Sequence, residues 1–319
     1  MLTLSLDGHL WPSRYCTTMR IFSVIILLVT LFFSSGQASA SPPIEISKEN
    51  LQQLHTQAAQ GNVRAQTALG EIYGGGVYVP QNYATARGWY EKAAAQGDKE
   101  AQYNLGQLYA NGRGVQQDYT IAREWWEKAA VLGMAQAQFN LGILYDNGQS
   151  VPQDYTVARE WYEKAAVQGL AEAQSNLGRM YQNGRGAPQD YTQTRLWYEK
   201  SAAQGYATAQ LNLGGLYATG QGVPQDYATA RQWWEKAAAQ GLAEAEYNLG
   251  ALYYSGRGIP QDNGKARQWW EQAAAHGNPN AQYNLGVLYA NGRGVPQDYT
   301  QARLWYEKSA AQGYATAQL

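Results

Sequence analysis

A period of 36 residues is the feature that most constrains how this chain of 319 residues folds. A glycine recurs on this step from Gly61 to Gly313, and a tryptophan recurs on it from Trp89 to Trp305. A repeat of roughly 20–50 residues is typical of arrays in which each unit packs only against its neighbours. We therefore predict one elongated array, with a leading half copy, seven full copies and a truncated eighth, in place of two globular domains.

Each copy carries two apolar stripes at helical spacing. In the copy that starts at Gly97, the positions i, i+4, i+7 and i+8 of a first helix, the A helix, over residues 98–110 are Ala101, Leu105, Leu108 and Tyr109. The same spacing on a second helix, the B helix, is held by Ala122, Trp126, Ala129 and Ala130. Asp118 is placed to cap the B helix, and glycines between the two helices favour a tight turn. The predicted fold is all-α.

Gly106 and its equivalents stand inside the A helix, where glycine costs about 1 kcal/mol relative to alanine. Their recurrence predicts that a facing helix passes close to this point. We expect the alanines Ala122, Ala129 and Ala130 to form the matching shallow surface, and the large Trp and Tyr side chains to fill the space between copies.

The pattern A-x-x-x-L-G-x-L-Y-x-x-G-x-G-V-x-x-D-Y-x-x-A-x-x-W-Y/W-E-K-A-A-x-x-G resembles the Sel1-like repeat, a relative of the tetratricopeptide repeat. The resemblance covers residues 51–319. It implies a right-handed superhelical α-solenoid of antiparallel helix pairs whose A helices line the concave side. It also implies a function as an adaptor in protein assemblies, signalling or host contact.

Composition and motifs exclude several classes of function. The 24 basic and 25 acidic residues leave a net charge of −1 without a basic run, which argues against nucleic-acid binding. Cys16 is the single cysteine, and no G-x-S-x-G, H-E-x-x-H, S-x-x-K or C-x-x-C motif is present. His276 replaces a glutamine that most copies have, so we interpret it as a surface substitution. We predict a protein that is not an enzyme and holds no cofactor or metal.

The N-terminal region has the layout of an export signal. Residues 19–40 contain one Arg, an apolar run from Ile21 to Phe33, and small residues that end in Ala38-Ser39-Ala40. This predicts a signal peptide over 19–40, an upstream extension over 1–18 that precedes the true start at Met19, and a linker over 41–50. The apolar run is too short for a membrane span. The expected product is periplasmic or secreted, without a membrane span after cleavage.

The A helices have one face on which the copies differ, which we call the varied face. Constant positions report how repeats pack, whereas varied positions are free to specialise. The varied positions lie at i, i+4 and i+7 of each A helix, away from its apolar stripe. We predict that a protein or peptide partner binds there, and a constant row of asparagines beside this face offers amides to a peptide backbone. The candidate partner-binding residues are Tyr103, Gln107, Phe139, Ile143, Arg179, Leu211, Tyr247, Tyr254, Tyr283 and Val287, with Asn104, Asn140, Asn176, Asn212, Asn248 and Asn284.

Structural interpretations of the same residues stay open. Drift on an idle surface would also produce varied rows, the aromatic residues at Tyr103 and its equivalents would also serve packing, and a constant Asn would also bridge adjacent repeats. Two other functions remain as alternatives. The 25 Tyr and 11 Trp favour a cell-wall or glycan-binding protein. A β-lactam or amide hydrolase is suggested by relatives that carry paired cysteines, which this chain lacks.

Overall fold

The computed structural model describes residues 47–313, and all regular structure in that range is helical. The helices fall into two units, residues 1–134 and 135–319. The first unit contains α2 (Lys48–Ala59), α3 (Val63–Gly75), α4 (Tyr83–Ala95), α5 (Lys99–Asn111) and α6 (Tyr119–Val131). The second contains α7 (Ala135–Asn147), α8 (Tyr155–Val167), α9 (Ala171–Asn183), α10 (Tyr191–Ala203), α11 (Ala207–Thr219), α12 (Tyr227–Ala238), α13 (Ala243–Ser255), α14 (Asn263–Ala275), α15 (Pro279–Asn291) and α16 (Tyr299–Ala311).

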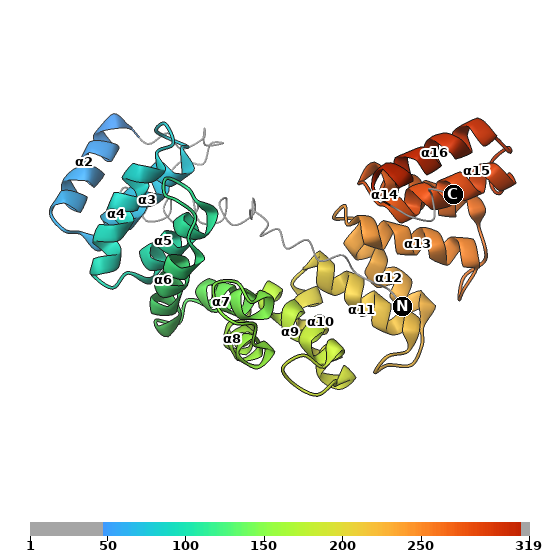
Figure 1. The fold of residues 1–319 in the computed structure, drawn as a ribbon, viewed down its shortest axis with the longest axis horizontal. Helices are drawn as coiled ribbons and strands as arrows, with labels where there is room; N and C mark the ends of the chain where they lie inside the picture. The colour runs from blue at the N-terminus through green and yellow to red at the C-terminus, as the bar shows by residue number, and fades with distance from the viewer. Residues whose placement is uncertain (1–46, 314–319) are drawn as a thin grey trace, which may run out of the picture. The chain divides into compact units, whose positions relative to one another are not determined.

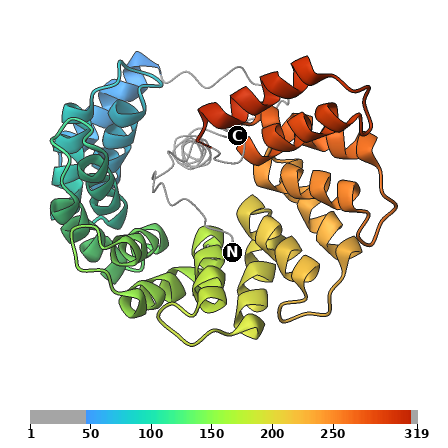
Figure 2. The ribbon, with the colours of Figure 1, turned by 45° about the vertical axis from the view of Figure 1, so that its right-hand side comes forward.

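Each predicted copy is a pair of helices packed on one another. The odd-numbered helices from α3 to α15 are A helices, and each packs against the B helix that follows it. A short connection folds the B helix back along its A helix (Figures 1 and 2). α2 stands in the place of a B helix and packs against α3, so it is the predicted half copy. Within each unit this arrangement confirms the predicted α-solenoid of helix pairs.

Side chains fix both ends of the connection between the helices of a pair. The Asp118 carboxylate accepts hydrogen bonds from the backbone N–H groups of Thr120 and Ile121, which confirms it as the N-cap of α6. Gly112 ends α5 with a φ of 63°, a left-handed angle that glycine adopts without strain. The Gln117 amide reaches back to the Ala110 carbonyl at 2.7 Å. The turn is therefore closed at both ends, because free carbonyls of α5 and free N–H groups of α6 find partners.

The apolar stripes form the core, as predicted. Ala101, Leu105 and Leu108 of the A helix are buried, and the B-helix stripe of α6 is buried with them. Tyr109 is only half-buried. The same positions are buried in the other described copies, except that Tyr306 and Ala310 of the last B helix are half-buried. Stability is therefore shared among successive neighbour contacts.

The recurrent A-helix glycine faces an aromatic ring, which corrects the expectation of an alanine surface. A Cβ added to Gly214 would lie 2.6 Å from two atoms of the Trp234 indole, and one added to Gly178 would lie 2.7 Å from the Tyr198 ring. All seven equivalent glycines face the buried or half-buried aromatic residue of their own B helix. The B helix does pass close, as predicted, because the Cβ added to Gly214 would also lie 3.1 Å from the Ala230 carbonyl oxygen. The shallow surface of alanine side chains was wrong, since the aromatic ring needs the space that a methyl group would fill.

Tryptophans and glutamines join one copy to the next. Trp125 of α6 packs on the core formed by α4 and α5, as predicted for the large aromatic residues. The Gln66 amide donates to the Ala58 carbonyl of α2 and accepts a 2.9 Å bond from Gln96, which follows α4. We call this second contact a glutamine bridge. Equivalent bridges in the second unit join Gln168 to Gln138, Gln204 to Gln174, Gln240 to Gln210 and Gln312 to Gln282.

The boundaries expected at the N-terminus are tested only in part. α2 begins at Lys48 after the N-cap Ser47, so the last three residues of the predicted linker over 41–50 are helical. The predicted extension over 1–18, the signal peptide over 19–40 and the truncated eighth copy after residue 313 lie outside the described residues. Within residues 47–313, no helix combines the length and apolar character that crossing a membrane requires.

Candidate functional site: the varied face of the A helices

The candidate residues lie on the A helices as predicted, but the helices around them cover them in part. Asn140 is buried, and every other candidate residue is half-buried. Four other varied positions, Thr67, Ala110, Asp146 and Ser175, are also buried. The varied face is therefore a partly covered surface that offers portions of side chains to a partner.

The first varied row packs on the B helices. The rings of Phe139 and Tyr162 lie 5.7 Å apart, and those of Tyr283 and Tyr306 lie 5.4 Å apart, both tilted. Leu211 contacts the core of the next copy. The packing role that the sequence left open for these positions is thus present, and it coexists with partial exposure.

The asparagine row bridges repeats where the neighbouring B helix carries a tyrosine. A hydrogen bond links Asn176 of α9 to the Tyr162 hydroxyl of α8, and another links Asn212 of α11 to Tyr198 of α10. Burial raises the pKa of both phenols, so both stay protonated. Tyr162 donates a hydrogen bond to Asp146 and Tyr198 donates one to Gln182, and the asparagine amides donate to the phenol oxygens. At these two junctions the structural interpretation of the row holds.

Arg179 is held by an ion pair within the varied face. Its Nη2 lies 2.7 Å from Oδ2 of Asp146, whose side chain is 6% exposed, and Tyr162 donates to the same carboxylate oxygen at 3.3 Å. The pair joins α7 to α9. A buried carboxylate requires such partners, so much of the binding capacity of Arg179 is already used.

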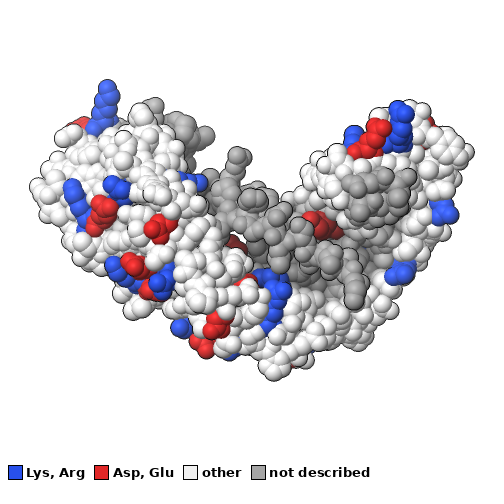
Figure 3. All heavy atoms as spheres, in the orientation of Figure 1, with Lys and Arg blue, Asp and Glu red and all other residues white. Residues whose placement is uncertain are grey.

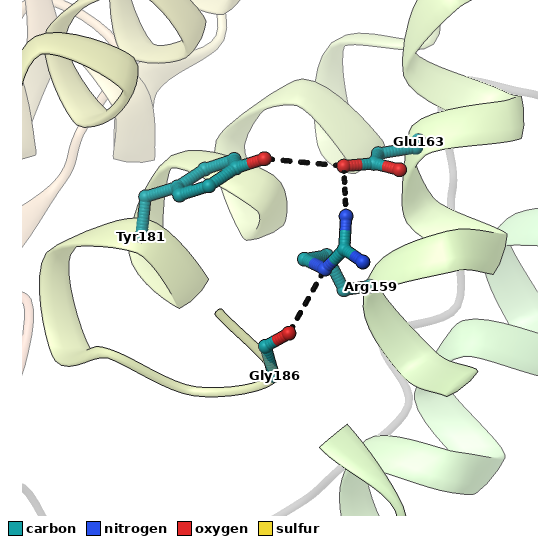
Figure 4. A network of polar contacts seen from close by, with 4 residues as sticks. All are labelled: Arg159, Glu163, Tyr181 and Gly186. Carbon is teal, nitrogen blue, oxygen red and sulfur yellow. Dashed lines mark hydrogen bonds and ion pairs between the residues drawn. The ribbon is translucent and has the colours of Figure 1, made fainter. Parts of the chain in front are cut away.

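A second polar network lies on the B-helix side of the same copies (Figure 4). The Arg159 Nε donates to the Gly186 carbonyl at 3.0 Å, and its guanidinium pairs with Glu163. Tyr181 donates to the same Glu163 carboxylate at 3.2 Å. Burial, reinforced by that carboxylate, raises the pKa of Tyr181. These contacts join α8 to α9 and to the loop after α9, so the network stabilises the packing of neighbouring copies.

A cavity opens on the varied face of the second unit. It has a volume of about 120 Å³ and is lined by Tyr254 and Ala251 of α13, Trp270 of α14, and Asn284 and Val287 of α15. Three of these five residues are predicted partner-binding residues. The structure thus brings Tyr254, Asn284 and Val287 together, although they are up to 33 positions apart in the sequence.

Most faces of the recurrent tryptophans are already occupied. In six copies a lysine ammonium lies about 4 Å from the centre of the half-buried indole, as for Lys164 over Trp161 at 3.9 Å. Trp126 and Trp270 are buried. Acidic and basic side chains lie intermixed on the face drawn in Figure 3. Among the described residues, no group of three or more His, Cys, Asp or Glu side chains is placed to hold a metal ion.

Sequence reasoning missed the role of the glutamines. Their recurrence at two fixed positions 30 residues apart was a usable signal, since two constant amides suggest a constant bond. The signal is clearest where both change, because His276 replaces one glutamine and Glu246 the other, and their Nδ1 and Oε2 atoms lie 2.8 Å apart. His276 is exposed but paired, so it is more than a neutral surface substitution.

Comparisons with known proteins agree with this geometry. The Sel1 repeat family model matches seven consecutive segments, residues 63–98, 99–134, 135–170, 171–206, 207–242, 243–278 and 279–314. One similar crystal structure is a protective antigen present in uropathogenic Escherichia coli strains that displays an SLR fold, with 40% identity and a TM-score of 0.76. The match covers 85% of this chain and 58% of that antigen, so this chain spans less than two thirds of it.

A second similar structure is a Sel1 repeat protein from Oxalobacter formigenes, with 37% identity and a TM-score of 0.70. The match covers 85% of this chain and 78% of that one. No protein with a curated functional description matches the chain.

Proposed function

The chain belongs to the Sel1 repeat family, and on that premise we propose that it is an exported scaffold that binds a protein or peptide on the varied face of its A helices. The supporting observation is that packing positions and varied positions differ in burial within each copy. The packing positions, such as Leu105 and Trp126, are constant in character and buried, whereas all of the candidate partner-binding residues except Asn140 are half-buried. A repeat protein specialises at such positions without loss of its stack.

The chemistry of the varied face suits a protein partner. It combines aromatic residues such as Tyr254 with aliphatic residues such as Val287 and with side-chain amides. Partly exposed aromatic and aliphatic groups with a few polar groups are typical of the anchors of protein interfaces. The glycan alternative has less support, because lysines already cover the half-buried indoles.

The location proposed for this activity is the periplasm or the extracellular space. It rests on the three-part signal over residues 19–40. The description of a relative as a protective antigen agrees with an exported protein. N-terminal sequencing of the exported product tests this, and a mature chain that starts far from Ser41 would contradict it.

Site-specific photocrosslinking tests the binding face. The first variant carries a photoreactive amino acid at Gln107, on the varied face of α5. The control variant carries it at Glu124, on α6 of the same unit and away from the varied face. We expect a discrete crosslinked protein from position 107 in envelope and culture fractions, and none from position 124. Equal crosslinking from both positions would refute the proposed face. Sedimentation with peptidoglycan without any protein crosslink would favour the glycan alternative, and nitrocefin turnover would favour the hydrolase.

A further inference from the structure

The copy formed by α13 and α14 differs from the others at positions that meet in space. Position 254 is Tyr, where the other copies carry Gly74, Ala110, Asp146, Gln182, Ala218 and Ala290. The first residue of the B helix is Asn263, where the other copies carry Tyr83, Tyr119, Tyr155, Tyr191, Tyr227 and Tyr299. The first of these exchanges places Tyr254 in the wall of the cavity of about 120 Å³ described above.

Two aromatic rings form the apolar part of the cavity wall. The rings of Tyr254 and Trp270 lie 5.4 Å apart at a tilt of 43°. Trp270 is 2% exposed and its Nε1 donates to the Tyr247 carbonyl at 3.1 Å, so its position is fixed. The cavity, about 120 Å³, is smaller than the enclosed cavity of about 150 Å³ that holds a benzene ring, and its size matches a branched aliphatic side chain.

Asn284 supplies an amide without a partner. Its equivalents Asn176 and Asn212 bond to the hydroxyl groups of Tyr162 and Tyr198. The residue in that place before Asn284 is Trp270, which has no hydroxyl group. No hydrogen bond joins the Asn284 side chain to another described residue, and the amide lines the cavity. Its donor and acceptor match the two groups of a peptide bond.

Arg293 brings a positive charge beside Tyr254, one of the residues that line the cavity. Two equivalent arginines lie over the ring at the start of the preceding B helix, Arg113 over Tyr83 and Arg185 over Tyr155. Asn263 removes that ring, and Arg293 instead donates to the Tyr254 hydroxyl at 2.5 Å. Arg293 is exposed and forms no ion pair within residues 47–313. Its remaining N–H groups suit a carboxylate.

We propose that this cavity binds a peptide segment with a leucine-sized aliphatic side chain beside a carboxylate. The side chain enters between Tyr254 and Trp270, the backbone amide meets Asn284, and the carboxylate meets Arg293. The inference rests on the proposed function and names the chemistry of the partner at one position of the varied face. Charge complementarity selects an acidic segment, because Arg293 is a cation without a carboxylate partner.

N-acetyl-L-leucine contains the three groups in one small molecule and serves as the probe. Titration of the full chain, followed at the Trp270 indole N–H by NMR, is expected to give a saturable shift. N-acetyl-L-leucinamide, which lacks the charge, is expected to bind about tenfold more weakly, the lower end for a charge-assisted hydrogen bond at a partly exposed site. N-acetylglycine, which lacks the side chain, is expected to give no saturation.

Matched variants assign the contact. Arg293→Gln is expected to weaken N-acetyl-L-leucine about tenfold, whereas Arg257→Gln, the same change one copy earlier, leaves binding unchanged. Tyr254→Ala introduces the residue of three other copies and is expected to abolish saturation while the helix content stays constant. No saturable shift, or equal effects of the two arginine variants, would overturn the inference.

The same variants separate this inference from the proposed function. One outcome is that position 107 still crosslinks a protein, while Arg293→Gln does not change how much of that protein the whole chain captures. The varied face is then the binding surface, but the cavity is not the binding position. If position 107 yields no crosslink while N-acetyl-L-leucine binds with the predicted variant pattern, the cavity stands and the scaffold function fails.

Discussion

Neighbouring glycines of α11 offer a direct test of why glycine recurs in the A helices. A Cβ on Gly214 would lie 2.6 Å from two atoms of Trp234 and 3.1 Å from the Ala230 carbonyl oxygen, whereas one on Gly215 would meet nothing within 4 Å. Both residues are inside the same helix, so Gly→Ala gains the same helix propensity of about 1 kcal/mol at each. Any difference between the two variants therefore reports the contact with the indole.

The magnitude follows from the displacement that Gly214→Ala imposes. Carbon atoms pack at about 3.5–4.0 Å, so the Trp234 ring must move by about 1 Å. Its Nε1 donates to the Leu211 carbonyl at 3.1 Å, and a shift of that size breaks this bond at a cost of about 1 kcal/mol. Overpacking adds about 1–3 kcal/mol. After the propensity gain, we expect Gly214→Ala to lose about 1–3 kcal/mol and Gly215→Ala to gain about 1 kcal/mol.

Urea unfolding of the two variants, followed by circular dichroism, measures the difference. Because solenoids unfold by segments, the comparison uses the same probe and the same conditions for both variants. Adding Trp234→Leu should reduce the cost of Gly214→Ala, since the smaller side chain leaves room for the methyl group. Equal stabilisation by both alanines would refute the steric explanation of the glycine row.

Three further predictions concern bonds between copies and at caps. Leu132→Gln should stabilise the first unit by about 1 kcal/mol in urea unfolding, because the buried Gln102 Oε1 has no hydrogen-bond partner where five other copies have a glutamine bridge. Gln168→Leu should show the reverse loss, and no gain from Leu132→Gln would argue against that role of the bridge. Arg179→Met should lower the free energy of unfolding by roughly 2–3 kcal/mol, less than for a wholly buried ion pair because the Arg179 side chain is 34% exposed. Adding Asp146→Ala should recover part of this loss, and an unchanged urea midpoint of the single variant would contradict the prediction. A hydrogen bond from the Thr229 hydroxyl lowers the pKa of Asp226. The stabilisation from this carboxylate is therefore present above the pKa of the unfolded chain and is lost as the pH falls through the lower pKa of the folded chain. Thr229→Val should raise the Asp226 pKa measured by NMR, and an unchanged pKa would refute the assignment.

The helix pairs and their caps were predictable because they depend on local chemistry. Ala101, Leu105 and Leu108 mark an apolar stripe through their spacing alone, and Asp118 marks a helix start because its side chain bonds to N–H groups two and three residues away. These signals recur in successive copies, so their agreement with the helix-pair pattern is not due to chance. The structure confirms them in each described copy.

The contacts between positions far apart in the sequence were harder to predict from the sequence. The recurrence of Gly214 and its equivalents showed that space is needed there, but not that an aromatic ring 20 residues later takes it. Varied positions were identified correctly on the A helices, yet Asp146 and Ala110 proved buried, since helical spacing gives the direction of a side chain and not the reach of the neighbouring helix.

The sequence by itself determined the repeat, the helix pair, the caps and the face on which copies differ, because each of these depends on residues within one or two helical turns or on a fixed period. Only the tertiary structure decided which varied residues act together. Tyr254 lines the cavity with Asn284 and accepts a hydrogen bond from Arg293 because α13 and α15 pack on α14. Asn263 and Trp270 also lack the phenol groups that contact two equivalents of Arg293 and two equivalents of Asn284. Such a combination depends on side-chain packing across helices, which a linear pattern does not specify.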